Sequence, residues 1–163
     1  MTQFDLKNAV IKIKDGTAPT PNEITVKIGE GTMTFSEKRP LMYKKNRGRL
    51  DDVVTADEEP VEVSIDAVWD YIKASSGATP TIIDALKKRG EAASWVSSDV
   101  NTCRPYAVDI EVTYTPICDD EDIETITLSD FRYEDISHNL KEGQFSITGK
   151  CNITEPTIVR TAQ

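Results

Sequence analysis

Apolar and polar residues alternate in several short segments of this sequence, a pattern typical of β-strands with one buried and one solvated face. Residues 9–14 form the first such segment. Residues 24–28 form a second, and the alternation resumes over residues 33–35. Gly29 and Gly31 lie between those two stretches and predict a bulge or a tight turn.

The clearest alternation lies further along the chain. Residues 61–72 and 106–114 each place every second side chain, all apolar, on one face. Residues 131–140 and 145–153 then predict a hairpin, and Gly143 in the connection between them suits the left-handed position of a short bulged loop. Antiparallel strands therefore dominate the predicted structure.

One short helix is predicted between these strands. Thr79 can cap it, Pro80 suits its first turn, and Gly90 can end it. An apolar stripe along it consists of Ile82, Ile83 and Leu86. A helix of about ten residues is too short to be stable alone, so it must dock on the sheet. Residues 91–104 carry no clear pattern.

The length of 163 residues predicts a single domain over residues 1–163. Its fold class is mainly β: an antiparallel β-sandwich or barrel with one short flanking α-helix and an extended charged loop. That loop, at about residues 37–60, is called the arm below. A basic half is followed by an acidic half, and few apolar residues anchor it.

Composition excludes several classes of function. The net charge of −9 disfavours nonspecific binding to nucleic acid, which depends on counterions released by Lys and Arg. No apolar run approaches the roughly 20 residues that span a bilayer, and the N-terminal residues do not resemble a signal peptide, so we expect cytoplasmic synthesis and no membrane. The three cysteines match no zinc spacing, and we expect them reduced and mostly buried.

Catalytic chemistry has little support. His138 is the only histidine, and nothing places Cys103, Cys118 or Cys151 in an activating environment. The acidic run over residues 119–122 lacks the spacing of a calcium loop, and residues 29–31 are not a phosphate-binding turn. We therefore expect no enzyme, no metal and no cofactor.

Three interpretations remain. Trp69 and Trp95, if exposed, would suit a β-sandwich that binds a small ligand or a glycan. Alternatively, copies of the chain associate: sheet edges offer unpaired backbone groups, and the arm offers a head-to-tail contact between opposite charges. In a third interpretation the arm is a hairpin whose charges pair internally. The candidate interface residues are Lys44, Lys45, Arg47, Arg49, Asp51, Asp52, Asp57, Glu58 and Glu59.

Four ordered stretches between about residues 8 and 152 carry a resemblance to a known family. They are residues 22–39; residues 47–53 with 57–64; residues 89–93 with 103–109; and residues 131–134 with 149–152. In these stretches the chain resembles the major tail tube proteins of long-tailed bacteriophages. Ala56 stands where that family has a glycine before the residue matching Asp57, a difference that would stiffen the turn.

The resemblance implies a structural subunit that assembles into hexameric rings, which stack into a hollow tail tube through which DNA passes without specific binding. Other partners would be the tape measure, terminator, baseplate or tip proteins and, in contractile tails, a sheath. The particle would be the virion tail, assembled in the host bacterial cytoplasm. A tube protein of a contractile secretion-type apparatus is the alternative. Candidate side chains facing the bore, where negative charge would repel DNA, are Glu62, Asp66, Asp70, Asp109 and Glu111.

Overall fold

The computed structural model describes residues 5–26, 28, 31–68, 79–118 and 120–163. Its strands run antiparallel, and one short α-helix lies beside them. The strands are β1 (Ala9–Lys14), β2 (Glu23–Val26), β3 (Met33–Ser36), β4 (Leu41–Asn46), β5 (Arg49–Thr55), β6 (Val61–Val68), β7 (Val108–Tyr114), β8 (Ile123–Asn139), β9 (Gln144–Cys151) and β10 (Thr157–Thr161). The helix α1 spans Ile82–Lys87, and two 3₁₀ turns cover Leu6–Asn8 and Gly90–Ala92.

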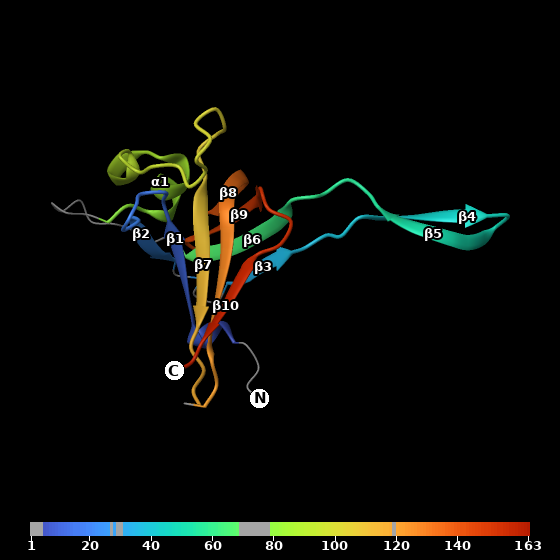
Figure 1. Cartoon of the computed structure of the whole chain (residues 1–163). Coiled ribbons are helices and arrows are strands. Elements are labelled where there is room, and N and C mark those ends of the chain that lie inside the picture. The colour runs from blue at the N-terminus through green and yellow to red at the C-terminus, as the bar shows by residue number, and fades with distance from the viewer. Residues whose placement is uncertain (1–4, 27, 29–30, 69–78, 119) are drawn as a thin grey trace.

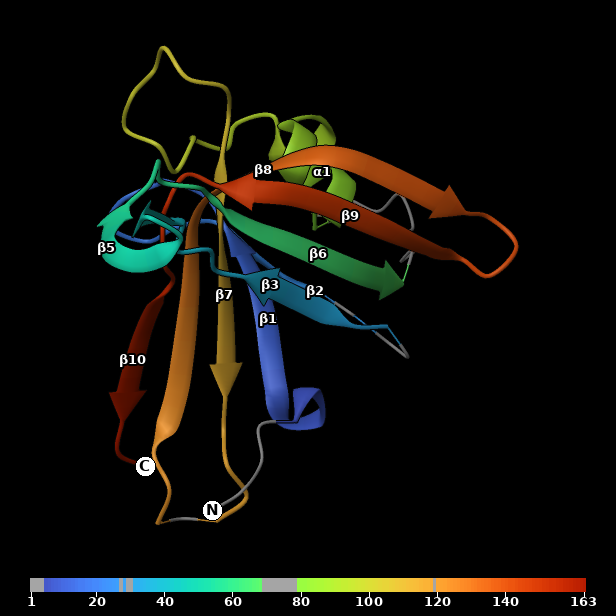
Figure 2. The same cartoon turned by 90° about the vertical axis from the view of Figure 1, so that its right-hand side faces the viewer.

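Eight strands form one folded sheet in the order β2-β1-β7-β8-β9-β6-β3, with β10 on β8. The long strand β8 joins its two parts, since its first half pairs with β7 and β10 and its second half with β9. Asp130, at φ +57°, lies between the halves. Figure 2 shows β1, β7 and the first half of β8 running across the direction of β9, β6 and β3. The predicted mainly β, sandwich-like fold is confirmed, and the described strands form no closed barrel.

The predicted alternation explains the core. In β6 and β7 every second side chain is buried and the intervening ones are only partly exposed. The inner faces of both parts of the sheet meet in one apolar cluster, in which Phe131, Ile65, Ile110 and Ile147 are each at most 1% exposed. Burying such side chains contributes about 1.5–3 kcal/mol each, which makes this cluster the main source of stability.

The helix is shorter than predicted. Its N-cap is Thr81 and not Thr79, because the Thr81 hydroxyl accepts a hydrogen bond of 3.1 Å from the Asp84 backbone N–H. Pro80 therefore precedes the helix. The C-cap is Lys88 in the left-handed conformation, at φ +52°, and Gly90 instead opens the following 3₁₀ turn. Ile83, Ala85 and Leu86 are buried, as docking on the sheet requires.

Several strand boundaries also differ from the predictions. The strand predicted over residues 61–72 is described to Val68; residues 69–72 lie outside the described residues, as does Gly29. Tyr106 precedes β7 in a loop and is not part of the strand. The turn at Gly31 is confirmed, since its N–H donates to the Ile28 carbonyl at 3.0 Å. Gly143 lies at φ +65°, as predicted for the hairpin loop.

Two buried carboxylates fasten residues 91–104 to the sheet. Asp15 accepts hydrogen bonds from Thr17, Asn22 and the Val96 backbone. Burial raises its pKa, but these hydrogen bonds outweigh that effect and hold the pKa below its usual range. Asp99 accepts from the Asn101 backbone and from two guanidinium groups, those of Arg132 at 2.8 Å and Arg104 at 3.2 Å, and its pKa falls to about 2.

The cysteines are only partly as expected. All three are free, and Cys151 is buried, but Cys103 and Cys118 are exposed, so the expectation of mostly buried cysteines is wrong. Cys103 lies in the segment between the Gly90–Ala92 turn and β7, and Cys118 lies in the loop between β7 and β8, so neither is on the inner face of a strand. Among the described residues, no helix has the length and apolar character needed to cross a bilayer.

Candidate assembly interface

The arm is a β-hairpin. Strands β4 and β5 pair only with each other, in a two-stranded sheet that is separate from the main one. Figure 1 shows this hairpin projecting far to one side of the remaining strands. The two residues of its turn, Arg47 and Gly48, have φ of +51° and +80°, which a tight type I′ turn requires at both positions.

A backbone hydrogen bond and two ion pairs hold the base of the arm, where the hairpin joins the main sheet. The Ala56 N–H donates to the Pro40 carbonyl at 3.0 Å, which closes the hairpin where the two strands begin and end. Lys38 Nζ lies 3.0 Å from a Glu62 carboxylate oxygen on β6 and 3.5 Å from one of Glu59. The hydrogen bond to Glu62 is the main reason that the Lys38 pKa is raised. These contacts connect the arm to the outer face of β6.

Beyond this base, almost all side chains of the arm are exposed. In β4 every residue is exposed, and in β5 only Val54 is partly covered. Five large apolar side chains are exposed here: Leu41 by 36%, Met42 by 55%, Tyr43 by 60%, Leu50 by 73% and Val53 by 49%. An isolated two-stranded hairpin is at best marginally stable in water. Apolar side chains on such an element are typical of a surface that another protein covers.

The basic side chains at the tip of the arm form no ion pair with its acidic residues. Lys44 lies opposite Asp52 in the strand register, yet no ion pair joins them. Within the described residues, none of Lys44, Lys45, Arg47 and Arg49 has a carboxylate within 4.0 Å; the ion pairs of the arm all involve Lys38. The hairpin of the third interpretation is therefore present, but the internal charge pairing that it supposed is limited, among the described residues, to Lys38 with Glu59 at the base.

The nine predicted interface residues do not all meet. Lys44, Lys45, Arg47 and Arg49 lie around the tip, and Asp51 and Asp52 follow on β5. Asp57, Glu58 and Glu59 lie on the segment that returns to β6, at the other end of the hairpin. The seven residues of β5 span about 23 Å at about 3.3 Å per residue, so Asp57, Glu58 and Glu59 lie far from the basic tip, whereas Asp51 and Asp52 lie near it.

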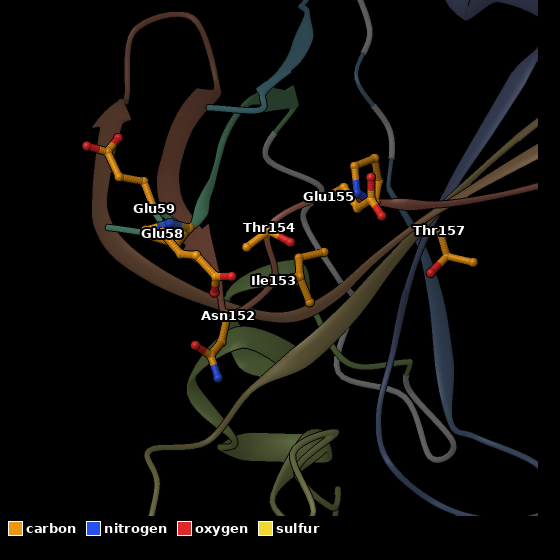
Figure 3. Close-up of a pocket in the computed structure, with 9 residues that line it drawn as sticks. Glu58, Glu59, Asn152, Ile153, Thr154, Glu155 and Thr157 are labelled. Atoms are coloured by element: carbon orange, nitrogen blue, oxygen red, sulfur yellow. The ribbon is translucent and has the colours of Figure 1, made fainter. Parts of the chain in front are cut away.

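The acidic residues of the returning segment line a groove that the sequence did not predict. Residues 58–60 and 152–157 enclose an open groove of about 780 Å³, called the root groove below. Figure 3 shows Glu58 and Glu59 on one side of it, Glu155 and Thr157 on the other, and Ile153 between them. No sequence pattern signals it, because the two segments that form it lie more than 90 residues apart.

The candidate side chains for a bore lie on two separate strands. Glu62 and Asp66 are on the outer face of β6, and Asp109 and Glu111 on that of β7. Strands β8 and β9 stand between β6 and β7, and both inner faces contribute to one core, so the two outer faces point in different directions. A single bore could be lined by one pair and not by both. Asp70 lies outside the described residues.

Each described bore candidate already has a partner in its own chain. Lys38 contacts Glu62, and Lys14 Nζ lies 2.8 Å from Glu111. The Ser146 hydroxyl donates to Asp66 at 2.5 Å. Asp109 is largely covered and accepts from the Asp130 backbone, and burial raises its pKa. Asp109 is therefore a poor source of open negative charge.

His138 and Trp95 are among the residues considered for chemistry or ligand binding that the structure describes. No group of three His, Cys, Asp or Glu side chains there is arranged to hold a metal ion. His138 lies beside the Phe145 ring, with centroids 6.2 Å apart. Trp95 is only 4% exposed, so it is not the exposed aromatic that a glycan site would need, and Trp69 lies outside the described residues.

Comparison with known proteins adds a likeness of fold. No family model matches the chain, and no curated protein matches it in sequence. Among solved structures, the chain is similar to one in the cryo-EM structure of an extracellular contractile injection system, described as a PVC sheath/tube terminator in the extended state. The TM-score is 0.58 at 9% sequence identity, and the alignment covers 99% of each chain.

Proposed function

We propose that this chain is a structural subunit of a tail-like tube and has no enzymatic activity. The observation that carries the proposal is the arm: a projecting hairpin with exposed apolar side chains and with basic side chains at its tip that have no carboxylate partner among the described residues. The hairpin adds no residue to the apolar core of its own chain, so it contributes little to the stability of a monomer. A subunit that binds its neighbours in an assembly would use the hairpin as a contact surface.

A tube needs contacts in two directions, and the chain offers a different surface for each. For contacts around a ring, β2, β3 and β10 each pair with a single strand among the described residues, and their other edges are candidates for pairing with a strand of a neighbour. For contacts between rings, the arm reaches away from the sheet. Contacts of the first kind can close into a ring, whereas those of the second propagate along an axis.

The fold comparison supports a role in tail assembly. The similar chain belongs to a contractile, tail-like particle, and the likeness extends over the whole of both chains. In the finer proposal, six copies form each ring, the rings stack into the tail tube of a bacteriophage, and DNA passes through during ejection. Tape measure, terminator and baseplate or tip proteins would be its other partners. A tube of a contractile secretion-type apparatus is compatible with the same observations.

A second candidate is a terminator, which would end a tube and not extend it. The description of the similar chain as a sheath/tube terminator favours it. The two candidates share the fold and the arm but differ in what the pure protein does. A tube subunit propagates, whereas a terminator stops at a single ring.

Negative-stain electron microscopy of the purified protein at high concentration, over several salt concentrations, tests the proposal. Rods of stacked rings would support a tube subunit. Discrete rings that do not elongate would favour the terminator. Monomers alone, under every condition, would contradict both.

A further inference from the structure

We infer that the root groove of one copy receives the arm tip, residues 44–49, of a second copy of this chain. The inference rests on the proposed self-assembly and names the surface that the arm contacts. It makes the contact a pairing of two different surfaces: a basic, projecting tip and an acidic, recessed groove.

Charge is the first argument. The arm tip carries four basic side chains and no acidic one, although the whole chain has a net charge of −9. The root groove is lined by Glu58, Glu59 and Glu155 and by no basic residue. Within the described residues, Glu58 and Glu155 have no ion-pair partner, and neither do the basic side chains of the tip. Each surface therefore carries the charge that the other lacks.

Shape is the second argument. Small-molecule sites are mostly enclosed and apolar, and they bury most of the ligand. The root groove is instead open and acidic, at about 780 Å³, and has Ile153 and Pro156 among its lining residues. A projecting hairpin end with long basic side chains and the apolar Leu50 beside them suits such a groove.

The tip cannot reach the groove of its own chain. The groove lies at the base of the hairpin, where Glu58 and Glu59 lead back into β6, and the tip lies at its far end (Figures 1 and 3). Strand β5 alone separates the two by about 23 Å. Occupation of the groove by a tip must therefore be intermolecular.

Because tip and groove are different surfaces, each copy can give its tip to one neighbour and receive a tip from another. Such a heterologous contact generates a ring if it closes and a filament if it does not. The groove also lies next to β10, since Thr157 both lines it and begins that strand. An occupied groove would thus place a neighbour beside β10, which among the described strands pairs only with β8.

A charge exchange tests the pairing. The first variant reverses the tip, Arg47→Glu with Arg49→Glu, and the second reverses the groove, Glu58→Lys with Glu155→Lys. Each should raise the protein concentration needed for assembly at least about tenfold, because like charges then meet. A third variant carries all four substitutions and should recover assembly, because the charges are again opposite. All four positions are exposed, so circular dichroism should show an unchanged fold.

Lys141→Glu, in the β8–β9 turn, is the matched control and should assemble like the natural chain, since it reverses an exposed charge on a different hairpin. Sedimentation and negative-stain microscopy provide the readout. If the natural chain assembles but the groove reversal has no effect, the groove is not the receptor, and the proposed function stands. If both reversals block assembly and the combined variant is also blocked, tip and groove do not pair with each other. If the natural chain never assembles, the proposed function itself is wrong.

Discussion

The body of the molecule and its arm are both made of antiparallel strands, but they use their side chains in opposite ways. In β6 alternate side chains are buried in the core, with Val61 at 0% and Ile65 at 1% exposure. In β4 no side chain is buried, and Tyr43 is 60% exposed. In the body, apolar and polar side chains alternate because one face of each strand is buried within the chain. The exposed apolar side chains of the arm are best explained by burial against another chain.

The same difference separates stability from assembly. Core strands contribute stability in proportion to the apolar surface they remove from water. The arm removes little, so substitutions there should scarcely change the free energy of unfolding. The following predictions test this division, beginning with the largest expected effect.

The largest effect is expected in the core. Phe131→Ala removes a ring that is 1% exposed and should lower the free energy of unfolding by about 3–5 kcal/mol, because it leaves a cavity where β7, β8 and β9 meet. Urea denaturation followed by circular dichroism measures this. A loss below about 1 kcal/mol would show that this core does not carry the stability of the body.

A smaller effect is expected where two backbone segments touch. A Cβ atom at Gly16 would lie 2.1 Å from the Ser97 carbonyl oxygen, so Gly16→Ala must displace the backbone of residues 97–98 from the segment that follows β1. It should lower the free energy of unfolding by about 1–3 kcal/mol.

In the arm, an added Cβ at Gly48 meets no atom within 4 Å, but φ is +80°. Gly48→Ala should therefore strain only the turn and leave the denaturation midpoint of the body unchanged.

Acid should weaken the body through Asp99. The Asn101 N–H and the guanidinium groups of Arg132 and Arg104 lower the Asp99 pKa to about 2, whereas an unfolded aspartate titrates near 3.9. The stability that this carboxylate contributes is therefore complete above about pH 4 and is lost as the pH falls through about 2. Asp99→Asn should lower the denaturation midpoint at pH 7 and flatten its fall between pH 4 and pH 2.

Asp51→Asn is the matched control for the acid experiment. Asp51 is exposed on the arm, and its carboxylate makes no hydrogen bond or ion pair within the part of the chain that the structure describes. Denaturation midpoints across the same pH range should equal those of the natural chain. If the fall of the denaturation midpoint with pH is flattened equally in Asp51→Asn and Asp99→Asn, Asp99 is not the group responsible for it.

The smallest effect on stability is expected at the exposed aromatic of the arm. Tyr43→Ala should change the free energy of unfolding by less than about 0.5 kcal/mol, yet it should raise the concentration at which the protein assembles. Parallel denaturation and sedimentation measurements separate the two quantities. A large loss of stability without a change in assembly would reverse the interpretation of the arm.

The sequence predicted the parts of the fold in which one face is buried. The period-two pattern located β1, β6 and β7, since alternation is a direct consequence of one-sided burial. It missed β10, in which all five residues are exposed, because an edge strand with no buried side chain has no apolar period. It also missed the first half of β8, whose threonines obscure the alternation.

For the candidate site, the sequence predicted the separated charges of the arm but not what surrounds them. The residues on both halves are local in the chain and are visible as runs of charge. Whether Lys44 would pair with Asp52 depended on side-chain geometry, and the root groove depended on bringing residues 58–60 opposite residues 152–157. Neither follows from a local pattern, because both arise from tertiary structure.

Removal of the arm tests the central claim most directly. Replacing residues 41–55 with a short glycine linker removes β4 and β5 but no residue of the core. The shortened chain should unfold at the same urea concentration as the natural one and sediment only as an unassembled species at concentrations where the natural chain forms larger particles. Undiminished assembly of the shortened chain, or its failure to fold, would contradict the division between a folding body and an assembling arm.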